Sequence, residues 1–237
     1  MKLKQLSVFF PAYNEAAVIA KTVTAANQVL KKIAEQYEII VVNDGSTDNT
    51  ANQVKALNLP RLQLASHPKN LGYGEAMKTV WKKSRYPWIL SCDADGQFNF
   101  KEISQFIPFI KDYDLIIGYR RQRSDSRYRR FMAAVLRLVN IILFRLNLKD
   151  VDCGFKLISR KVIQTVWPLT TASAITVTEL MVKALRQGFK VKEIGVKHHH
   201  RKGGEQTGGK LKVVVKGAWE GIKLWLALKQ QRPENQQ

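Results

Sequence analysis

The stretch from Trp88 to Gln97, with the sequence WILSCDADGQ, decides the fold. Its first five residues are mostly apolar and predict a buried strand, which ends abruptly at two carboxylates, Asp93 and Asp95. Side chains alternate along an extended chain, so both acids project the same way, and like charges at that spacing repel unless a cation lies between them. The stretch therefore predicts either a divalent-cation site at the end of a strand or solvated acids in an ordinary turn.

Strand and helix patterns alternate on both sides of this stretch. Strands are expected at 6–10, 37–42, 62–65, 88–92, 114–118 and 189–196. Helices are expected at 15–35, from after the turn at 43–48 to about 57, and from the loop at 70–74 to about 83. Further helices are expected at 101–111, 131–144, 175–187 and 210–229. This alternation predicts an α/β fold with a mostly parallel sheet and helices on both faces, and Asn14 is expected to cap the first helix.

Polar residues follow three of the expected strands, at 11–15, 43–48 and 93–97. The carboxyl ends of parallel strands share one edge of a sheet, so these segments are expected to meet in a nucleotide-type cleft. The segment 70–74 contains glycine, but it has neither a Walker loop nor the G-x-G-x-x-G spacing of a dinucleotide site.

Length and composition are those of an ordinary globular domain. The chain has 237 residues, of which 45% are hydrophobic and 24% charged. No apolar run reaches the roughly 18–20 residues that a membrane-spanning helix needs, and residues 1–5 lack a signal-peptide pattern. The two cysteines form no metal-ligand pattern. A cytoplasmic location with reduced thiols is the expectation.

The net charge of +20 calls for an anionic partner. Basic residues crowd 120–130, the apolar stretch 131–144 follows, and lysines are mixed with tryptophans and other apolar residues in 210–229. Both expected helices either lie on an anionic membrane surface or pack on the domain. Nucleic acid is not expected as a partner, since the aromatic residues do not interleave with the basic ones and no helix-turn-helix or zinc-finger spacing occurs.

Two further polar features have two interpretations each. Glu179 lies among apolar residues. It is interpreted either as a general base or as the partner of a nearby cation. The histidines at 198–200 precede a glycine-rich segment, which we expect to close on phosphate groups rather than to hold zinc, since no cysteine lies nearby.

Seven short motifs, in order, carry a resemblance to a known family. They are Pro11-Ala12-Tyr13-Asn14-Glu15, Val42-Asn43-Asp44-Gly45-Ser46-Thr47-Asp48, Asn70-Leu71-Gly72, Asp93-Ala94-Asp95-Gly96-Gln97, Gly118-Tyr119-Arg120, Asp152-Cys153-Gly154-Phe155-Lys156 and Arg201-Lys202-Gly203-Gly204. From Leu6 to about Leu228 the chain resembles the family-2 glycosyltransferases of the GT-A fold, and most of all the dolichyl-phosphate mannose synthase and polyprenyl-phosphate glycosyltransferase group. The resemblance implies one GT-A domain at 1–230, with a nucleotide-sugar half at about 1–118, an acceptor half at about 119–230 including C-terminal amphipathic helices, and a polar tail at 231–237.

The resemblance also implies roles for individual residues. The nucleotide-sugar pocket would be formed by Pro11, Ala12, Tyr13, Glu15, Asp44, Gly72 and Asp93. A Mg²⁺ or Mn²⁺ ion on the donor diphosphate would be held by Asp93, Asp95 and Gln97. The acceptor phosphate would be bound by Arg120, Arg129 and Arg201, because arginine binds phosphate oxygens in pairs. Asp95, Arg120 and Arg201 would carry the catalysis.

The implied reaction is the inverting transfer of mannose or glucose, from GDP-mannose or UDP-glucose, to a polyprenyl or dolichyl phosphate at the membrane surface. Many relatives carry transmembrane helices that this sequence lacks, so peripheral attachment or a membrane-protein partner is expected. A serine expected near the end of the last motif is replaced by Gln206. The alternatives are a transferase acting on a hydroxyl group and a non-catalytic basic module that binds membrane or nucleic acid.

Overall fold

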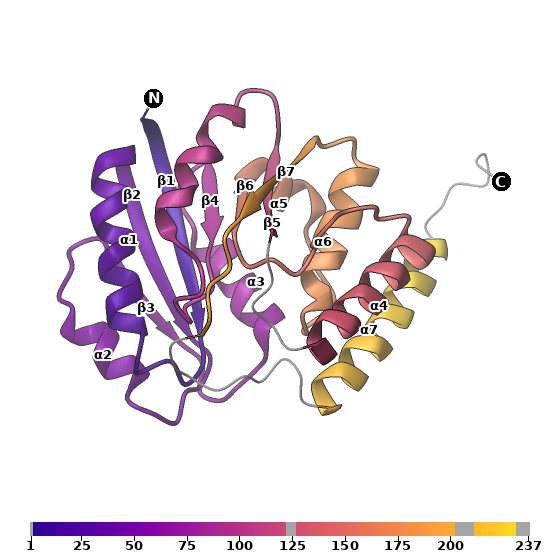
Figure 1. Cartoon of the computed structure of the whole chain (residues 1–237), viewed down its shortest axis with the longest axis horizontal. Helices are drawn as coiled ribbons and strands as arrows, with labels where there is room; N and C mark the ends of the chain where they lie inside the picture. Colours follow the sequence, from indigo (N-terminus) through magenta and orange to yellow (C-terminus); the bar gives the residue numbers. More distant parts are fainter. Residues whose placement is uncertain (1, 122–126, 202–210, 231–237) are drawn as a thin grey trace.

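A seven-stranded mixed sheet forms the centre of the computed structural model, with strand order β3-β2-β1-β4-β6-β5-β7 (Figure 1). The structure describes residues 2–121, 127–201 and 211–230, and side chains within 2–121, 130–201 and 214–230. The Arg129 side chain, the glycine-rich segment after Lys202, Gln206 and the tail at 231–237 therefore lie outside what is described. The strands are β1 (Leu3–Ala12), β2 (Ala34–Asn43), β3 (Leu62–Ser66), β4 (Trp88–Ser91), β5 (Leu115–Arg120), β6 (Lys156–Ser159) and β7 (Val191–Val196).

The sheet is parallel except at β6, which runs antiparallel to its neighbours β4 and β5. β1 pairs in parallel with β2 and β4, β2 with β3, and β5 with β7. The predicted mostly parallel sheet is confirmed. As a result, six strands end at one edge of the sheet, and β6 begins there.

Helices cover both faces, as predicted. The helical elements are α1 (Ile19–Ile33), α2 (Thr50–Ala56), α3 (Tyr73–Lys83), η1 (Phe100–Gln105), η2 (Ile107–Phe109), α4 (Arg127–Phe144), α5 (Arg160–Val166), α6 (Ile175–Arg186) and α7 (Leu211–Gln230). Successive residues of β1 point to opposite faces, so Phe10 joins a buried cluster with Val23 of α1, while Phe9 joins a second cluster with Val80 of α3. The second cluster also takes in residues of α5, α6 and the inner side of α7.

Two local predictions were wrong. The helix predicted at 101–111 is a pair of 3₁₀ turns, η1 and η2, where Asn99 accepts a hydrogen bond from the Lys101 N–H and Pro108 lies within η2. Asn14 does not cap α1, because it has a positive φ of 55° and its side chain accepts from Thr47 N at 2.9 Å, joining the turns after β1 and β2. α1 accordingly begins four residues later than expected.

The sequence patterns did not predict β6 and α5. Lys156–Ser159 is short and carries a charged residue, so it lacks the apolar run of the other buried strands. It is nevertheless central to the sheet, with Lys156 in register with both Ser91 and Ile117.

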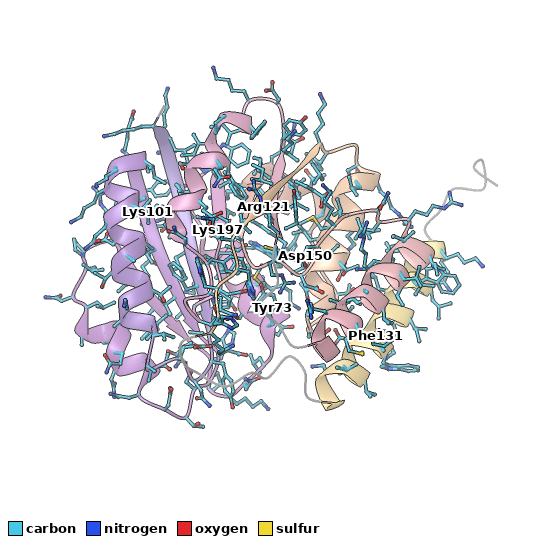
Figure 2. The ribbon with its side chains drawn as sticks, in the orientation of Figure 1. Tyr73, Lys101, Arg121, Phe131, Asp150 and Lys197 are labelled. Carbon is cyan, nitrogen blue, oxygen red and sulfur yellow. The ribbon has the colours of Figure 1, made fainter. Side chains whose placement is uncertain are left out.

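The helices α4 and α7 lie at the end of the molecule opposite α1 and α2 (Figure 1). Each buries one side, through Phe144 and through Leu224 and Leu228 respectively. Large apolar side chains on their other sides are exposed, among them Phe131, 64% exposed, which Figure 2 labels at α4. No helix among the described residues is both long enough and apolar enough to cross a bilayer.

Candidate active site

The polar segments predicted to meet do so at the edge where the parallel strands end. Glu15 follows β1, Asp44 follows β2, Asp93 and Asp95 follow β4, and Arg201 lies beyond β7. The register of the parallel pairs aligns these strand ends, since Ala12 lies beside Asn43 and Phe9 beside Ser91. This is the position at which open α/β sheets bind their ligands.

The carboxyl group of Asp93 rests directly on the backbone of Gly154. A Cβ atom at Gly154 would lie 2.1 to 2.3 Å from both oxygens and Cγ of Asp93, so only glycine leaves room for this acid. Burial and the neighbouring charge of Asp95 raise the pKa of Asp93 to about 7. The buried ammonium of Lys156 opposes this rise and donates a hydrogen bond to the Cys153 carbonyl.

Asp95 and Gln97 form a tight turn that is tied to the segment after β7. The Gln97 N–H donates to Asp95 Oδ1 at 3.0 Å, and the Gln97 side-chain amide donates to the His199 carbonyl at 2.9 Å. The His199 N–H donates back to the Gln97 carbonyl at 2.9 Å. This pairing carries the chain from β7 across the acid turn and brings Arg201 to Glu15 and Asp95.

Arg201 bridges two predicted functional acids. Its Nη2 pairs with Glu15 Oε1, and its Nη1 lies 3.5 Å from Asp95 Oδ2. Burial raises the pKa of Glu15 to about 8, with Arg201 opposing the rise and the charges of Asp95 and Asp93 adding to it. The other oxygen, Oε2, is buried without a hydrogen-bond partner among the described residues.

Asp44 organises the loop between β3 and α3. Its carboxylate accepts from the N–H groups of Leu71 at 2.9 Å and Gly72 at 2.8 Å, and Nδ1 of His67 lies 2.6 Å away. Nε2 of His67 in turn lies 2.9 Å from Thr79 Oγ1. Asp44 thus shapes the Gly72 loop, and its direct contact with a nucleoside stays a prediction.

Arg120, at the end of β5, is held by Asp150. Nε donates to Oδ2 at 2.6 Å and Nη2 donates to Oδ1 at 2.7 Å, a two-bonded pair in which both side chains are largely buried. Burial alone would lower the pKa of Arg120, but the bonds to Asp150 raise it. The guanidinium is therefore charged and fixed in orientation, and its contact with an acceptor phosphate stays a prediction.

Glu179 is engaged in structural bonds. Its carboxylate accepts from the N–H and the hydroxyl of both Thr170 and Thr171, and it pairs with Lys183 at 2.8 Å. Burial alone would raise the pKa of Glu179, but the bonds from Lys183 and the threonines lower it overall. Of the two interpretations of Glu179, the structure favours the paired acid over the general base.

A hard divalent cation fits the acid pair. Asp93 and Asp95 present carboxylate oxygens, and the Gln97 side chain adds an amide oxygen, the donor type that Mg²⁺ and Mn²⁺ prefer. Arg201 already places a positive charge against Asp95. The described residues contain no group of three or more histidine, cysteine or acidic side chains that could hold a metal, so the remaining ligands would come from the diphosphate and water.

Several residues of the site were not assigned roles from the sequence. Asp150, Gly154 and Lys156 support Arg120 and Asp93, and His67 supports Asp44. A signal existed for Gly154 and Lys156, which belong to the quoted Asp152–Lys156 motif. Nothing in the sequence linked Asp150 to Arg120, thirty residues away.

The seven-stranded mixed sheet, with helices on both faces, is that of the GT-A fold. Solved structures of glucosyl-3-phosphoglycerate synthase from Mycobacterium tuberculosis share this fold. One, with Mn²⁺, UDP and phosphoglyceric acid, has a TM-score of 0.74 at 16% identity and covers 94% of this chain and 78% of that chain. Another, with Mn²⁺ and UDP-glucose, has a TM-score of 0.73 at 16% identity over 98% of this chain and 81% of that one.

Residues 7–167 match glycosyl transferase family 2, and the chain belongs to that family. It is 30% identical over 232 residues to a dolichyl-phosphate beta-glucosyltransferase of Saccharomyces cerevisiae, covering 85% of this chain and 69% of the relative. It is 26% identical over 220 residues to an undecaprenyl-phosphate 4-deoxy-4-formamido-L-arabinose transferase of Yersinia enterocolitica, covering 90% of this chain and 65% of the relative. The predicted family and fold are confirmed.

Proposed function

We propose that this protein transfers glucose from UDP-glucose to a polyprenyl phosphate, with Mg²⁺ or Mn²⁺ bound at Asp93, Asp95 and Gln97. The observation that carries the proposal is the juxtaposition of the acid pair with two partly buried arginines, Arg120 and Arg201, at one edge of the sheet. The sequence left GDP-mannose and UDP-glucose open. The glucosyltransferase relative and the UDP-glucose complex of the structural neighbour favour UDP-glucose.

The chemistry requires positive charge more than it requires a base. A phosphate monoester has a second pKa near ~6, so the acceptor is an anion at neutral pH and attacks the anomeric carbon without losing a proton. The new bond forms on the face opposite the diphosphate, which leaves with its electron pair, so the configuration inverts. A bound divalent ion would neutralise the charge on the departing diphosphate. Arg120, fixed by Asp150, and Arg201 would hold the acceptor phosphate beside the donor.

The occupied carboxylate of Glu179 supports a phosphate acceptor over a hydroxyl acceptor. A hydroxyl acceptor requires a carboxylate base in the cleft, and Glu179 is bonded to Thr170, Thr171 and Lys183. Membership of an enzyme family also favours a transferase over a non-catalytic basic module.

We place α4 and α7 on the membrane surface that carries the acceptor. Their exposed apolar side chains are Phe131, Val135, Leu138, Val139 and Ile142 on α4, and Val215, Trp219, Ile222 and Leu226 on α7. Exposed cations lie among them, such as Arg137 and Lys223, and residues 127–144 contain no acid. An apolar surface with a basic rim is suited to an anionic bilayer, where each basic residue contributes about 1 kcal/mol.

A donor and acceptor screen tests the reaction. Purified protein with Mn²⁺ and a short-chain polyprenyl phosphate is offered UDP-glucose or GDP-mannose, and the same donors are offered with free sugars as hydroxyl acceptors. We expect glucosyl transfer to the lipid phosphate from UDP-glucose. Transfer to a free sugar alone, or from GDP-mannose alone, would contradict the proposed acceptor or donor.

Flotation with liposomes tests the membrane surface. We expect binding to anionic vesicles that weakens with salt, because surface charges are screened within a Debye length of about 8–10 Å at physiological salt. Ile142→Asp should weaken this binding, whereas the control Leu185→Asp, on an exposed residue of α6, should not. Equal binding of the two variants would place the membrane contact elsewhere.

A further inference from the structure

Four consecutive backbone N–H groups, at residues 170–173, are bound by two carboxylates from different helices. Glu179 of α6 accepts from Thr170 at 3.0 Å and Thr171 at 2.9 Å. Glu220 of α7 accepts from residues 172 and 173, both on Oε2, at 3.1 and 2.9 Å. We call residues 170–173 the clamped segment. Its course is therefore fixed by α6 and α7 together.

The clamped segment is packed against the loop that follows β3. The carbonyl of Ala172 accepts from Gly74 N at 3.1 Å. A Cβ atom at Gly74 would lie 2.1 Å from the Thr176 hydroxyl oxygen, 2.5 Å from the Ser173 carbonyl oxygen and 2.6 Å from the Ala172 carbonyl carbon. One at Gly72 would lie 3.2 Å from the Ala172 oxygen. The loop and the clamped segment are joined by this backbone hydrogen bond and packed closely at Gly74, so a shift of the clamped segment moves the loop.

The other side of this loop is bound by Asp44, which accepts from the N–H groups of Leu71 and Gly72. The loop is thus held between Asp44, after β2, and the clamped segment. Both Asp44 and Gly72 belong to the expected nucleotide-sugar pocket. Hydrogen bonds to charged acceptors are among the stronger ones in proteins. The position of the Glu220 carboxylate therefore affects the pocket through the clamped segment and the loop bonded to it.

Glu220 is the one acid of α7, whose sequence from Leu211 to Gln230 is otherwise apolar, polar or basic. Its side chain is only 16% exposed, and its second oxygen lies 3.9 Å from Lys216 Nζ. Neither contact with water nor binding to an anionic membrane accounts for a largely buried acid in this basic and apolar helix. Its contacts explain it, because they bind the clamped segment.

We propose that Glu220 is a positioning residue for the nucleotide-sugar pocket, holding the clamped segment against the Gly72–Gly74 loop. The role rests on the proposed function, since it takes this loop to be part of a UDP-sugar site. Glu220 contacts residues 172 and 173 and Lys216, none of which is assigned to a substrate. It acts through Ala172 and Gly74, and the helix that we place on the membrane thereby sets the shape of the donor site.

The test uses UDP with Mn²⁺ as the binding probe and the full chain throughout. Glu220→Gln keeps the shape of the side chain but removes its charge, and we expect the Kd for UDP and the KM for UDP-glucose to rise about tenfold. The acceptor KM and the kcat at saturating donor should stay within about twofold. A merely structural loss would reduce the active fraction, which lowers kcat and leaves both KM values unchanged.

Two further variants complete the experiment. Gly74→Ala disturbs the same contact from the loop side and should also raise the donor KM. Glu35→Gln, an exposed acid at the start of β2, is the matched control and should behave as the unmodified protein. If the unmodified protein binds UDP and Glu220→Gln binds it equally well, the positioning role is overturned. If the unmodified protein does not bind UDP, the proposed function fails instead.

Discussion

Gly154→Ala is the sharpest test of the acid pair. Gly154 does not have a positive φ, so an alanine meets no backbone strain there, and the whole effect comes from its Cβ atom. That atom would lie 2.1 to 2.3 Å from the Asp93 carboxyl group, whereas ordinary contact begins near 3.4 Å. The carboxyl group must therefore move by about 1 Å, and a misplacement of that size can reduce a rate about 100-fold.

We expect Gly154→Ala to lower kcat about 100-fold, which corresponds to about 2.7 kcal/mol in the activation free energy. Overpacking should also lower the free energy of unfolding by about 1–3 kcal/mol. The assays are transfer to polyprenyl phosphate, Mn²⁺ affinity by calorimetry, and thermal unfolding. Gly221→Ala is the control, because its Cβ atom would make only an ordinary contact of 3.8 Å with Ile175. A folded Gly154→Ala variant with unchanged Mn²⁺ affinity and turnover within twofold would refute the assigned role of Asp93.

Three further predictions concern other residues of the cleft. Asp95→Ala should abolish transfer and Mn²⁺-dependent UDP binding without unfolding the protein, and near-normal turnover without added metal would contradict its role as a ligand. Asp150→Asn should raise the acceptor KM more than the donor KM, because it releases Arg120 from a fixed orientation, and equal rises would place Arg120 on the donor. Glu15 has its pKa raised from 4.5 to about 8, so the folded state binds an extra proton in that range and the Glu15 contribution to stability is lost as pH rises through it. Between pH 5 and 8 the free energy of unfolding should therefore fall less for Glu15→Gln than for the unmodified protein, as measured by urea unfolding at each pH. The same dependence of the free energy of unfolding on pH in both proteins would contradict the raised pKa.

The sequence was sufficient to predict the part of the site in which polar residues directly follow apolar strands, because the same pattern indicates both the strand and the site. The apolar runs of β1, β2 and β4 end in polar segments, and the parallel topology aligns those ends, so the meeting of Glu15, Asp44 and Asp95 followed from periodicity alone. β6 was missed because a four-residue strand with a lysine has no such pattern. The pairing of Asp150 with Arg120 was missed because it depends on how the segment after α4 returns to the end of β5, which no local pattern encodes.

The double contact of Arg201 has a kinetic consequence. While Arg201 pairs with Glu15 and Asp95, those contacts occupy part of its guanidinium and leave fewer of its N–H groups for an acceptor phosphate. In the proposed reaction, the cation bound with the nucleotide would compete with Arg201 for Asp95 and so release Arg201 toward the acceptor. We therefore expect compulsory-order kinetics in which the donor binds first, and in which UDP inhibits competitively against the donor at every acceptor concentration.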